Sequence, residues 1–287
     1  MKNLYSFVIL IFLFALFANQ ATAQDKANKK STDKKYFKVA IDYQSDNIYS
    51  GRRDSISTGY ITPLLGYYTK SGFYINGSLS ILMNEGRVDV FSLEGGYDFK
   101  IGKLDGGISV QRYFYNAQSY NVQSEISGNA SANIGYQFKY LKPSLEAEFN
   151  IGATPDYALT VGFEHTFYAI DDELEITPSI FINGSTMNFY DSYFQKRRYA
   201  KTRKGSGETT GTVLNGAQFM TRDFEFSVPL DYTINKFSLN FTPGYVIPVN
   251  PNIVVIDTKS STGSTSNTYT EKLENTFFWS IGASYKF

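Results

Sequence analysis

The sequence predicts an all-β protein: a transmembrane antiparallel up-and-down β-barrel of about 12 strands, with 10 or 14 strands as alternatives. Three observations predict this class. Apolar and polar residues alternate with a period of two over most of the chain. Aromatic residues make up 17% of the chain, although its mean hydropathy is slightly negative. The connections between alternating segments are short on one side and long on the other, which is typical of an outer-membrane barrel.

The N-terminal segment has the pattern of a secretory signal peptide. Lys2 precedes an apolar run over residues 4 to 18, and Ala21 and Ala23 form a small-x-small cleavage site. A membrane anchor is the alternative, but the run is shorter than the roughly 20 residues that a helical span needs. We therefore expect a signal peptide over residues 1–23, cleaved near Ala23, and a flexible periplasmic tail over residues 24–35, which are mostly charged and polar. The outer-membrane barrel is expected over residues 36–287.

Composition excludes several function classes. The chain has no cysteine, so a lipoprotein anchor, disulfides and thiol chemistry are excluded. Lys plus Arg and Asp plus Glu both number 27, so the net charge gives no sign of a nucleic-acid partner. We expect no nucleic acid, no metal and no cofactor, because no glycine-rich phosphate loop or metal-ligand motif is present.

Twelve alternating segments follow the expected tail. In chain order they span about 36–49, 59–70, 72–83, 87–100, 104–116, 125–138, 140–151, 157–168, 173–189, 219–234, 236–249 and the terminal 277–287. The second segment reads GYITPLLGYYTK. In each of the ten segments after it, one face is apolar, and one residue of that face from each segment in turn is Ile75, Leu93, Ile108, Ala132, Ala147, Val161, Ile180, Phe226, Leu239 and Ile281. The opposite face carries Ser78, Glu94, Ser109, Asn133, Glu146, Thr160, Ser179, Glu225, Asn240 and Ser280. Each segment therefore predicts a strand between two different environments.

Five prolines fall inside these segments and make the strand number less certain: Pro63, Pro143, Pro178, Pro229 and Pro243. Proline has no amide hydrogen for the ladder, so it favours edges and bulges. This is why 10 or 14 strands remain alternatives.

The connections sort by length. Those after even-numbered segments are tight, as in Lys70-Ser71-Gly72 and Asn235-Lys236. Those after odd-numbered segments are longer and span about 50–58, 84–86, 117–124, 152–156, 190–218 and 250–271. An even strand number places both chain ends at the short-turn side, the periplasm. A secreted β-sandwich also alternates, but its connections need not sort by length.

The terminal segment FFWSIGASYKF carries its apolar face to the last residue. In a closed barrel the last strand pairs with the first, so this segment cannot fray. Such a segment also resembles the assembly signal read by the outer-membrane insertion machinery. The residues that would carry this signal are Trp279, Ile281, Ala283, Tyr285 and Phe287.

If the aliphatic faces contact lipid, the opposite parity lines the lumen. Its acidic members are Asp42, Glu94, Asp98, Asp105, Glu146, Glu148, Glu164, Asp223, Glu225 and Asp231. Lysines of the same parity lie mostly near the periplasmic rim, so the wall is net acidic and a water-filled pore should prefer cations. The alternative is that these carboxylates pair with cations and plug the barrel, since twelve strands leave a modest interior.

Two loops stand out. Residues 196–204 concentrate Lys196, Arg197, Arg198, Lys201, Arg203 and Lys204. Three interpretations of this basic extracellular loop are open. It contacts lipopolysaccharide phosphates, it folds into the lumen as a constriction, or it is a solvated and mobile loop. The last long loop, DTKSSTGSTSNTYT, is rich in Ser and Thr, and we expect it to be flexible.

We expect no enzymatic activity. Barrel enzymes often use a histidine near the extracellular rim beside Ser or Asp. The one histidine, His165, shares the parity of Phe163 and Phe167 and falls near the periplasmic end of an inward-running strand. A girdle position at the membrane interface is therefore the better interpretation than a catalytic one.

Residues 43–82 resemble the opening of porin-like outer-membrane barrels of about twelve strands from Bacteroidetes and proteobacteria. The matching residues are Tyr49, Gly51, Arg52, Pro63, Gly66 and Gly72. The order Ser-Gly-Arg-Arg departs from the Arg-Gly order of that pattern. The resemblance implies a channel with no named solute. We therefore expect a small passive channel, with a closed barrel that has a structural, partner-binding or lipopolysaccharide-binding role as the alternative. Expected partners are outer-membrane lipids, lipopolysaccharide and, during assembly, the insertion machinery.

Overall fold

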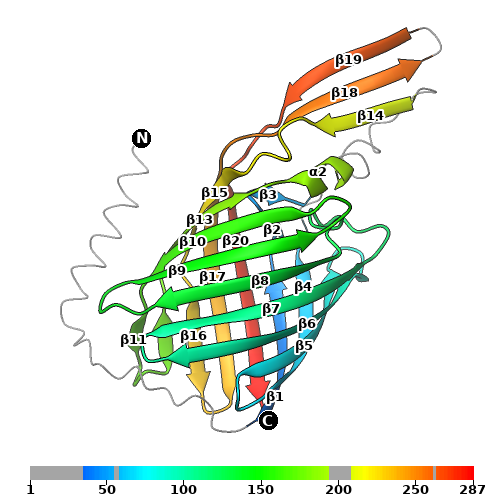
Figure 1. Ribbon diagram of the computed structural model, residues 1–287. Coiled ribbons are helices and arrows are strands. Elements are labelled where there is room, and N and C mark those ends of the chain that lie inside the picture. The colour runs from blue at the N-terminus through cyan, green and yellow to red at the C-terminus, as the bar shows by residue number, and fades with distance from the viewer. Residues whose placement is uncertain (1–34, 55–57, 194–207, 261–262) are drawn as a thin grey trace. The chain divides into compact units, whose positions relative to one another are not determined.

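The computed structural model describes residues 35–54, 58–193, 208–260 and 263–287. The expected signal peptide and residues 24–34 of the expected tail lie outside these ranges. Twelve strands form a closed antiparallel barrel (Figure 1). Around the ring they follow the order β1, β4, β5, β6, β7, β8, β9, β10, β13, β15, β17 and β20, and β20 also pairs with β1. The predicted fold class and the strand number of 12 are therefore confirmed.

Each of the twelve expected segments corresponds to one barrel strand. The bounds are β1 Tyr36–Gln44, β4 Tyr60–Tyr68, β5 Phe73–Leu82, β6 Arg87–Ile101, β7 Leu104–Tyr115, β8 Gly128–Tyr136, β9 Lys142–Ile151, β10 Asp156–Glu164, β13 Ser179–Ser185, β15 Met220–Ser227, β17 Phe237–Pro248 and β20 Thr276–Lys286. Each of these strands pairs with the next barrel strand along the chain, as the up-and-down order requires.

Three barrel strands are split near the short-turn end. β10 continues as β11 Phe167–Ala169, β13 is preceded by β12 Leu174–Ile176, and β15 continues as β16 Leu230–Ile234. Pro178 and Pro229 lie at two of the interruptions, where a missing amide hydrogen breaks the ladder. Their carbonyl groups still accept hydrogen bonds from His165 N–H at 3.3 Å and Thr177 N–H at 2.9 Å. The prolines interrupt strands without changing the number of strands in the ring.

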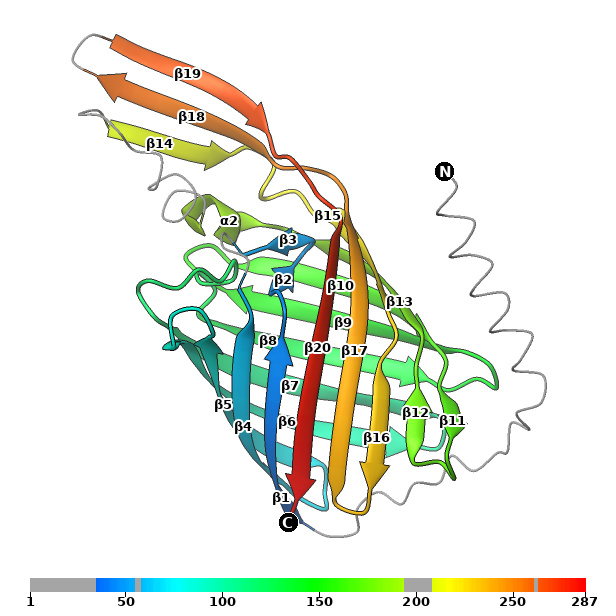
Figure 2. The same cartoon turned by 180° about the vertical axis from the view of Figure 1, so that it is seen from behind.

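The barrel closes at its last strand. β20 lies between β1 and β17, pairing Lys286 with Lys38 on one side and Tyr285 with Phe237 on the other (Figure 2). The N–H of Phe287 donates to the carbonyl oxygen of Phe37 at 2.9 Å. The terminal apolar face is thus fixed by two neighbouring strands up to its end.

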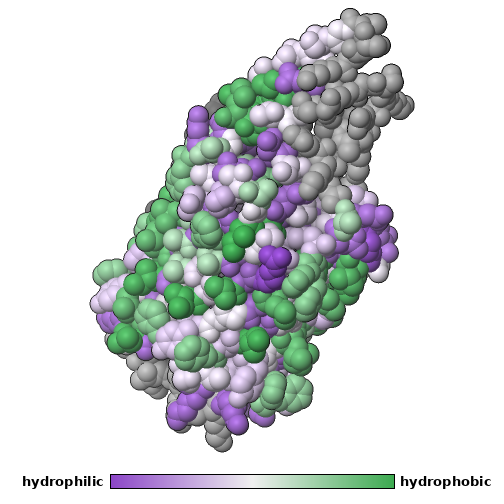
Figure 3. All heavy atoms as spheres, turned by 45° about the vertical axis from the view of Figure 1, so that its right-hand side comes forward, coloured by the Kyte–Doolittle hydropathy of each residue, from purple (hydrophilic) through white to green (hydrophobic). Residues whose placement is uncertain are grey.

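The outer face of the wall is apolar. Phe37, Ile75 and Val110 are 53%, 57% and 63% exposed, whereas their sequence neighbours of the other parity point inward. Apolar side chains are spread over the outer surface in Figure 3. A surface of this kind fits contact with lipid hydrocarbon. Among the described residues, no helix is long and apolar enough to cross a membrane.

The long loops contain structure that the sequence did not indicate. The last loop forms the hairpin β18 Ile253–Ser260 and β19 Gly263–Thr270, and β14 Glu208–Val213 pairs with β18 to complete a three-stranded sheet. Our expectation of a flexible loop there was wrong, because the Ser/Thr-rich segment pairs as a strand with the preceding Ile253–Ser260.

The ninth segment also ends earlier than expected, because residue 189 belongs to the short helix α2, Asn188–Tyr193. The Asp156 carboxylate of β10 accepts the N–H groups of Asn188 at 2.6 Å and Phe189 at 2.9 Å, so it caps this helix. The first long loop forms a small hairpin, β2 Ile48–Tyr49 and β3 Arg52–Arg53.

Candidate functional site: the barrel lumen and the loops across it

The inward face of the wall carries polar side chains that are in register across neighbouring strands. One such row crosses seven adjacent strands, through Asp98, Gly107, Asn133, Glu146, Thr160, Asn183 and Asp223. Because the strands are tilted, this row rises from near the short-turn end of β6 to near the long-loop end of β15. Thr160 donates to Asn183 Oδ1 at 2.7 Å, and Asn183 Nδ2 donates to Asp223 Oδ1 at 2.6 Å. The lumen is therefore lined here by acids, amides and a hydroxyl group.

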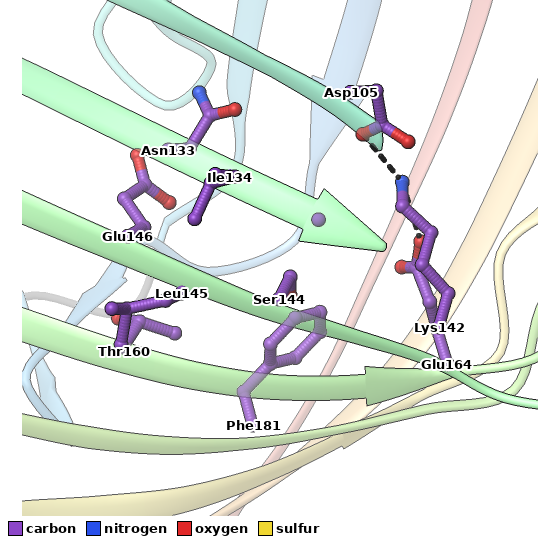
Figure 4. Close-up of a pocket in the computed structure, with 11 residues that line it drawn as sticks. Asp105, Asn133, Ile134, Lys142, Ser144, Leu145, Glu146, Thr160, Glu164 and Phe181 are labelled. Carbon is purple, nitrogen blue, oxygen red and sulfur yellow. Dashed lines mark ion pairs between the residues drawn. The ribbon is translucent and has the colours of Figure 1, made fainter. Parts of the chain in front are cut away.

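A cavity of about 190 Å³ lies against this wall toward the short-turn end. It is lined by residues of β7, β8, β9, β10 and β13, including Asp105, Glu146, Glu164 and Phe181 (Figure 4). Lys142 Nζ lies 3.0 Å from Asp105 Oδ1 and 3.2 Å from Glu164 Oε1. A polar space of this size holds several water molecules.

The structure brings some of the expected lumen residues together and separates others. Asp105, Glu146 and Glu164 share the cavity. Glu94 accepts a hydrogen bond from Tyr74 Oη at 2.7 Å on β5, and Asp42 accepts one from Asn240 at 3.4 Å.

The other expected lumen residues lie on separate strands. Glu148 lies on β9, two residues beyond Glu146 toward the long-loop end. Glu225 is in register with Phe181. Asp231 is in register with Asn240 on β17. Their assignment as the lining of a conducting lumen stays a prediction.

The first long loop does not remain above its own strand. Tyr49 lies five residues after Gln44, the end of β1, yet its Oη accepts a hydrogen bond from Asn150 Nδ2 of β9 at 2.8 Å. β9 is the sixth strand from β1 in either direction around the ring. Ser50 Oγ lies 3.0 Å from Ser185 Oγ of β13. We call residues 48–53 the crossing hairpin, because they reach the wall opposite β1.

A buried ion pair fixes the crossing hairpin. Arg52 Nη2 lies 3.1 Å from Glu271 Oε2, and the two side chains are 1% and 5% exposed. Glu271 also accepts from Tyr190 Oη at 2.6 Å and from Asn252 N–H at 3.2 Å. Arg52 donates further to the carbonyl oxygens of Ser50 and Asn250. Three long loops therefore meet at one carboxylate.

An apolar cluster packs beside this ion pair. We define the loop cluster as the buried Val122, Ile126, Met187, Phe189, Tyr190, Tyr193, Val213 and Val254. Tyr49 of the crossing hairpin and the inward-facing Tyr113 of β7 pack against it. The long-loop end of the barrel is thus filled by residues from at least four loops, whereas the short-turn end contains the polar cavity.

Asp54 connects the first loop to this cluster. It accepts hydrogen bonds from the Tyr60 hydroxyl, from Asn47 Nδ2 at 2.9 Å and from Val122 N–H at 2.7 Å. Burial raises the pKa of Asp54 from 3.8 to about 7, against the opposing effect of these donors, and the nearby Asp89 adds to the rise. Asp89 is itself paired with Arg87 at 3.1 Å.

His165 lies between β10 and β11. Its ring packs edge-on against Phe167, with ring centroids 4.5 Å apart. This aromatic pair fits the girdle interpretation. Within the described ranges, no group of three or more His, Asp or Glu side chains is arranged to hold a metal ion.

Two expected sites remain, the basic loop and the C-terminal assembly signal. The basic loop, Lys196 to Lys204, lies outside the described residues. The expected assembly signal lies on and just after β20, where Ile281, Tyr285 and Phe287 are exposed on the outer face. Recognition by insertion machinery stays a prediction.

Sequence reasoning missed the crossing hairpin as a lumen element. One signal was present, since Tyr49, Gly51 and Arg52 carry the resemblance to porin-like barrels. Gly51 has a φ of 72°, and a Cβ atom there would lie 3.0 Å from Asp223 Cβ and 2.9 Å from Pro248 Cβ. Only glycine lets the backbone approach β15 and β17 this closely.

The chain is similar to several solved outer-membrane proteins. They include the KdgM porin (TM-score 0.46, 10% identity, 87% of this chain and 99% of that chain) and the NanC porin (0.47, 10%, 88% and 100%). An outer-membrane channel from Pseudomonas putida has a TM-score of 0.44 and 9% identity, over 92% of this chain and 99% of that chain. These structure neighbours are porin-like outer-membrane proteins, the class that residues 43–82 resemble. No family model and no curated protein matches the chain.

Proposed function

We propose that the protein is a passive outer-membrane channel for small solutes, with a lumen that prefers cations. Export through the N-terminal signal peptide and insertion of the apolar outer face into the outer membrane place the short turns in the periplasm and the long loops outside. The observation that carries the proposal is the polar cavity inside a closed barrel, because an interior filled by apolar side chains would leave no path for water.

The cation preference follows from the charges around the cavity. Three carboxylates, Asp105, Glu146 and Glu164, face one ammonium group, Lys142, so the formal charge is three negative against one positive. In the described residues, no cation lies within ion-pair distance of Glu146 or Glu148. A net negative wall concentrates cations and repels anions in a narrow aqueous path.

Solute size is limited by the interior. Twelve strands enclose a modest space, and the crossing hairpin and the loop cluster occupy its long-loop end. The channel is therefore suited to ions and small polar molecules.

Planar-bilayer recording of the refolded protein tests the proposal. The wild type should show steady conductance with a reversal potential that indicates cation preference under a salt gradient. The variant Glu146→Gln with Glu148→Gln should lose most of that preference, whereas Glu274→Gln, on a loop with a 63% exposed side chain, should keep it. A folded barrel without conductance contradicts the channel, and preference unchanged in the double variant contradicts the acidic lining.

A closed barrel that binds a partner is the second candidate, and the loop cluster favours it. Buried apolar packing across the long-loop end is compatible with a permanently sealed lumen. In that case neither the wild type nor variants with a released crossing hairpin would conduct.

A further inference from the structure

The crossing hairpin has the position that a constriction needs. Its Tyr49 reaches β9, which is diametrically opposite β1 in the ring of twelve, and its Ser50 reaches β13. Gly51 lies against β17 and β15, so the contacts of the hairpin follow the half of the ring that runs from β1 to β9. The hairpin therefore covers part of the cross-section of the lumen instead of extending into the medium.

One side of the crossing hairpin is closely packed against the wall. Gly51 lies against β15 and β17, where a Cβ atom would approach Arg222 O at 3.2 Å and Pro248 Cβ at 2.9 Å. The described contacts of residues 49–52 thus involve β9, β13, β15 and β17. Little space remains between the hairpin and these four strands, and Tyr49 also packs against Phe189 of the loop cluster, with ring centroids 5.6 Å apart.

One ion pair holds the hairpin in this position. Arg52 donates from both Nε, at 3.2 Å, and Nη2, at 3.1 Å, to the same oxygen, Glu271 Oε2. Hydrogen bonds between a guanidinium and a carboxylate are stronger than those between neutral groups. Removal of one partner of a buried pair leaves an uncompensated charge, which is strongly destabilising. The neighbouring Arg53 differs, since its side chain is 44% exposed and lies 3.7 Å from Asp46.

From these contacts we infer that residues 48–53 form the constriction of the channel and that the Arg52–Glu271 pair is the positioning contact that keeps them across the lumen. This inference rests on the proposed channel function. It assigns size selection to the crossing hairpin and charge selection to the carboxylates of the cavity. Loss of the pair should therefore change the size limit more than the ion preference.

The test compares Arg52→Ala with its matched control Arg53→Ala. Folding of both barrels is verified by heat-modifiable migration before single-channel recording. Release of the hairpin in Arg52→Ala should raise single-channel conductance by about threefold and admit larger neutral polyethylene glycols, because the pore widens. Arg53→Ala should match the wild type in both measurements.

The outcomes separate the two proposals. If the wild type conducts and Arg52→Ala has the same conductance and polymer cut-off, the inference is wrong and the channel function stands. If neither conducts, the channel function is wrong and the inference fails with it.

A second variant decides the case in which Arg52→Ala fails to fold. The chain has no cysteine, so Ser50→Cys introduces a single thiol into the crossing hairpin. A cationic methanethiosulfonate reagent should reduce the current of Ser50→Cys by about half or more, because it attaches at the narrowest point. Ser264→Cys, on the exposed strand β19, is the control and should keep its current. Equal and small effects at both positions contradict the inference.

Discussion

The two ends of the lumen differ in how their polar groups are held. At the short-turn end, carboxylates line a cavity, and Lys142 bridges two of them at 3.0 and 3.2 Å. At the long-loop end, the charges of Arg52 and Glu271 are almost fully buried beside the loop cluster. A single barrel thus combines a polar wall built from regular strands with a compact core built from irregular loops. In the channel that we propose, the regular part sets which charges a solute meets, and the irregular part sets how much space it has.

The largest expected effect on stability comes from a substitution that disrupts the packing of the loop cluster and leaves the barrel wall intact. Val122 is fully buried and its N–H group already donates to Asp54, so Val122→Asp places a second carboxylate in an apolar site. The cost should be at least about 3 kcal/mol, confined to the loops. Limited proteolysis of the barrel in membranes should cut the long loops, while heat-modifiable migration stays that of the wild type.

The adjacent Gln123→Asp is the control for this substitution, since its side chain is only partly buried. Loss of the folded barrel in Val122→Asp would show that the two ends are not independent.

An intermediate effect is expected for the pH dependence of the stability of the long loops. Burial raises the pKa of Asp54 in the folded protein to about 7 from 3.8. A raised pKa means that the folded state holds the proton more tightly than the unfolded one, so its contribution to stability is complete below about pH 4 and is lost as pH rises through about 7. Protease cleavage of the long loops should therefore become faster from pH 5 to pH 8.

The variant Asp54→Asn should remove most of this pH dependence, because the amide cannot ionise. Asp46→Asn, beside the exposed Arg53, is the control and should retain it. Tyr60 and Asp89 also face Asp54, and an unchanged profile in Asp54→Asn would contradict the assignment of the pH dependence to Asp54.

The smallest expected effect is at the short-turn end. Lys142→Met removes the one ammonium group that lines the cavity and leaves three carboxylates. The cation-to-anion permeability ratio should rise by about twofold, because the wall becomes more negative. Reversal potentials measure this ratio, with Lys139→Met in the turn after β8 as the control. An unchanged ratio in Lys142→Met would show that Lys142 does not face the path of the ions.

The contrast between regular strands and irregular loops also explains which features could be predicted from the sequence. All twelve barrel strands were recognised within a few residues, because each has one face toward lipid and one toward the lumen, and this pattern is local. Glu146, Glu164 and Asp105 were placed on the lumen face by the same rule. The crossing hairpin was not, because its contacts join Ser50 to Ser185 and Arg52 to Glu271, 135 and 219 residues apart. The β18–β19 hairpin was missed because polar strands outside the membrane have no apolar face to show alternation.

The closing strand has a consequence for synthesis. β1 is made early and needs the ladder of β20, with Lys38 opposite Lys286. Until Thr276–Lys286 has been made, β1 lacks a partner on one edge, and free strand edges are prone to aggregation. Closure of the barrel therefore has to wait until the last strand has been synthesised.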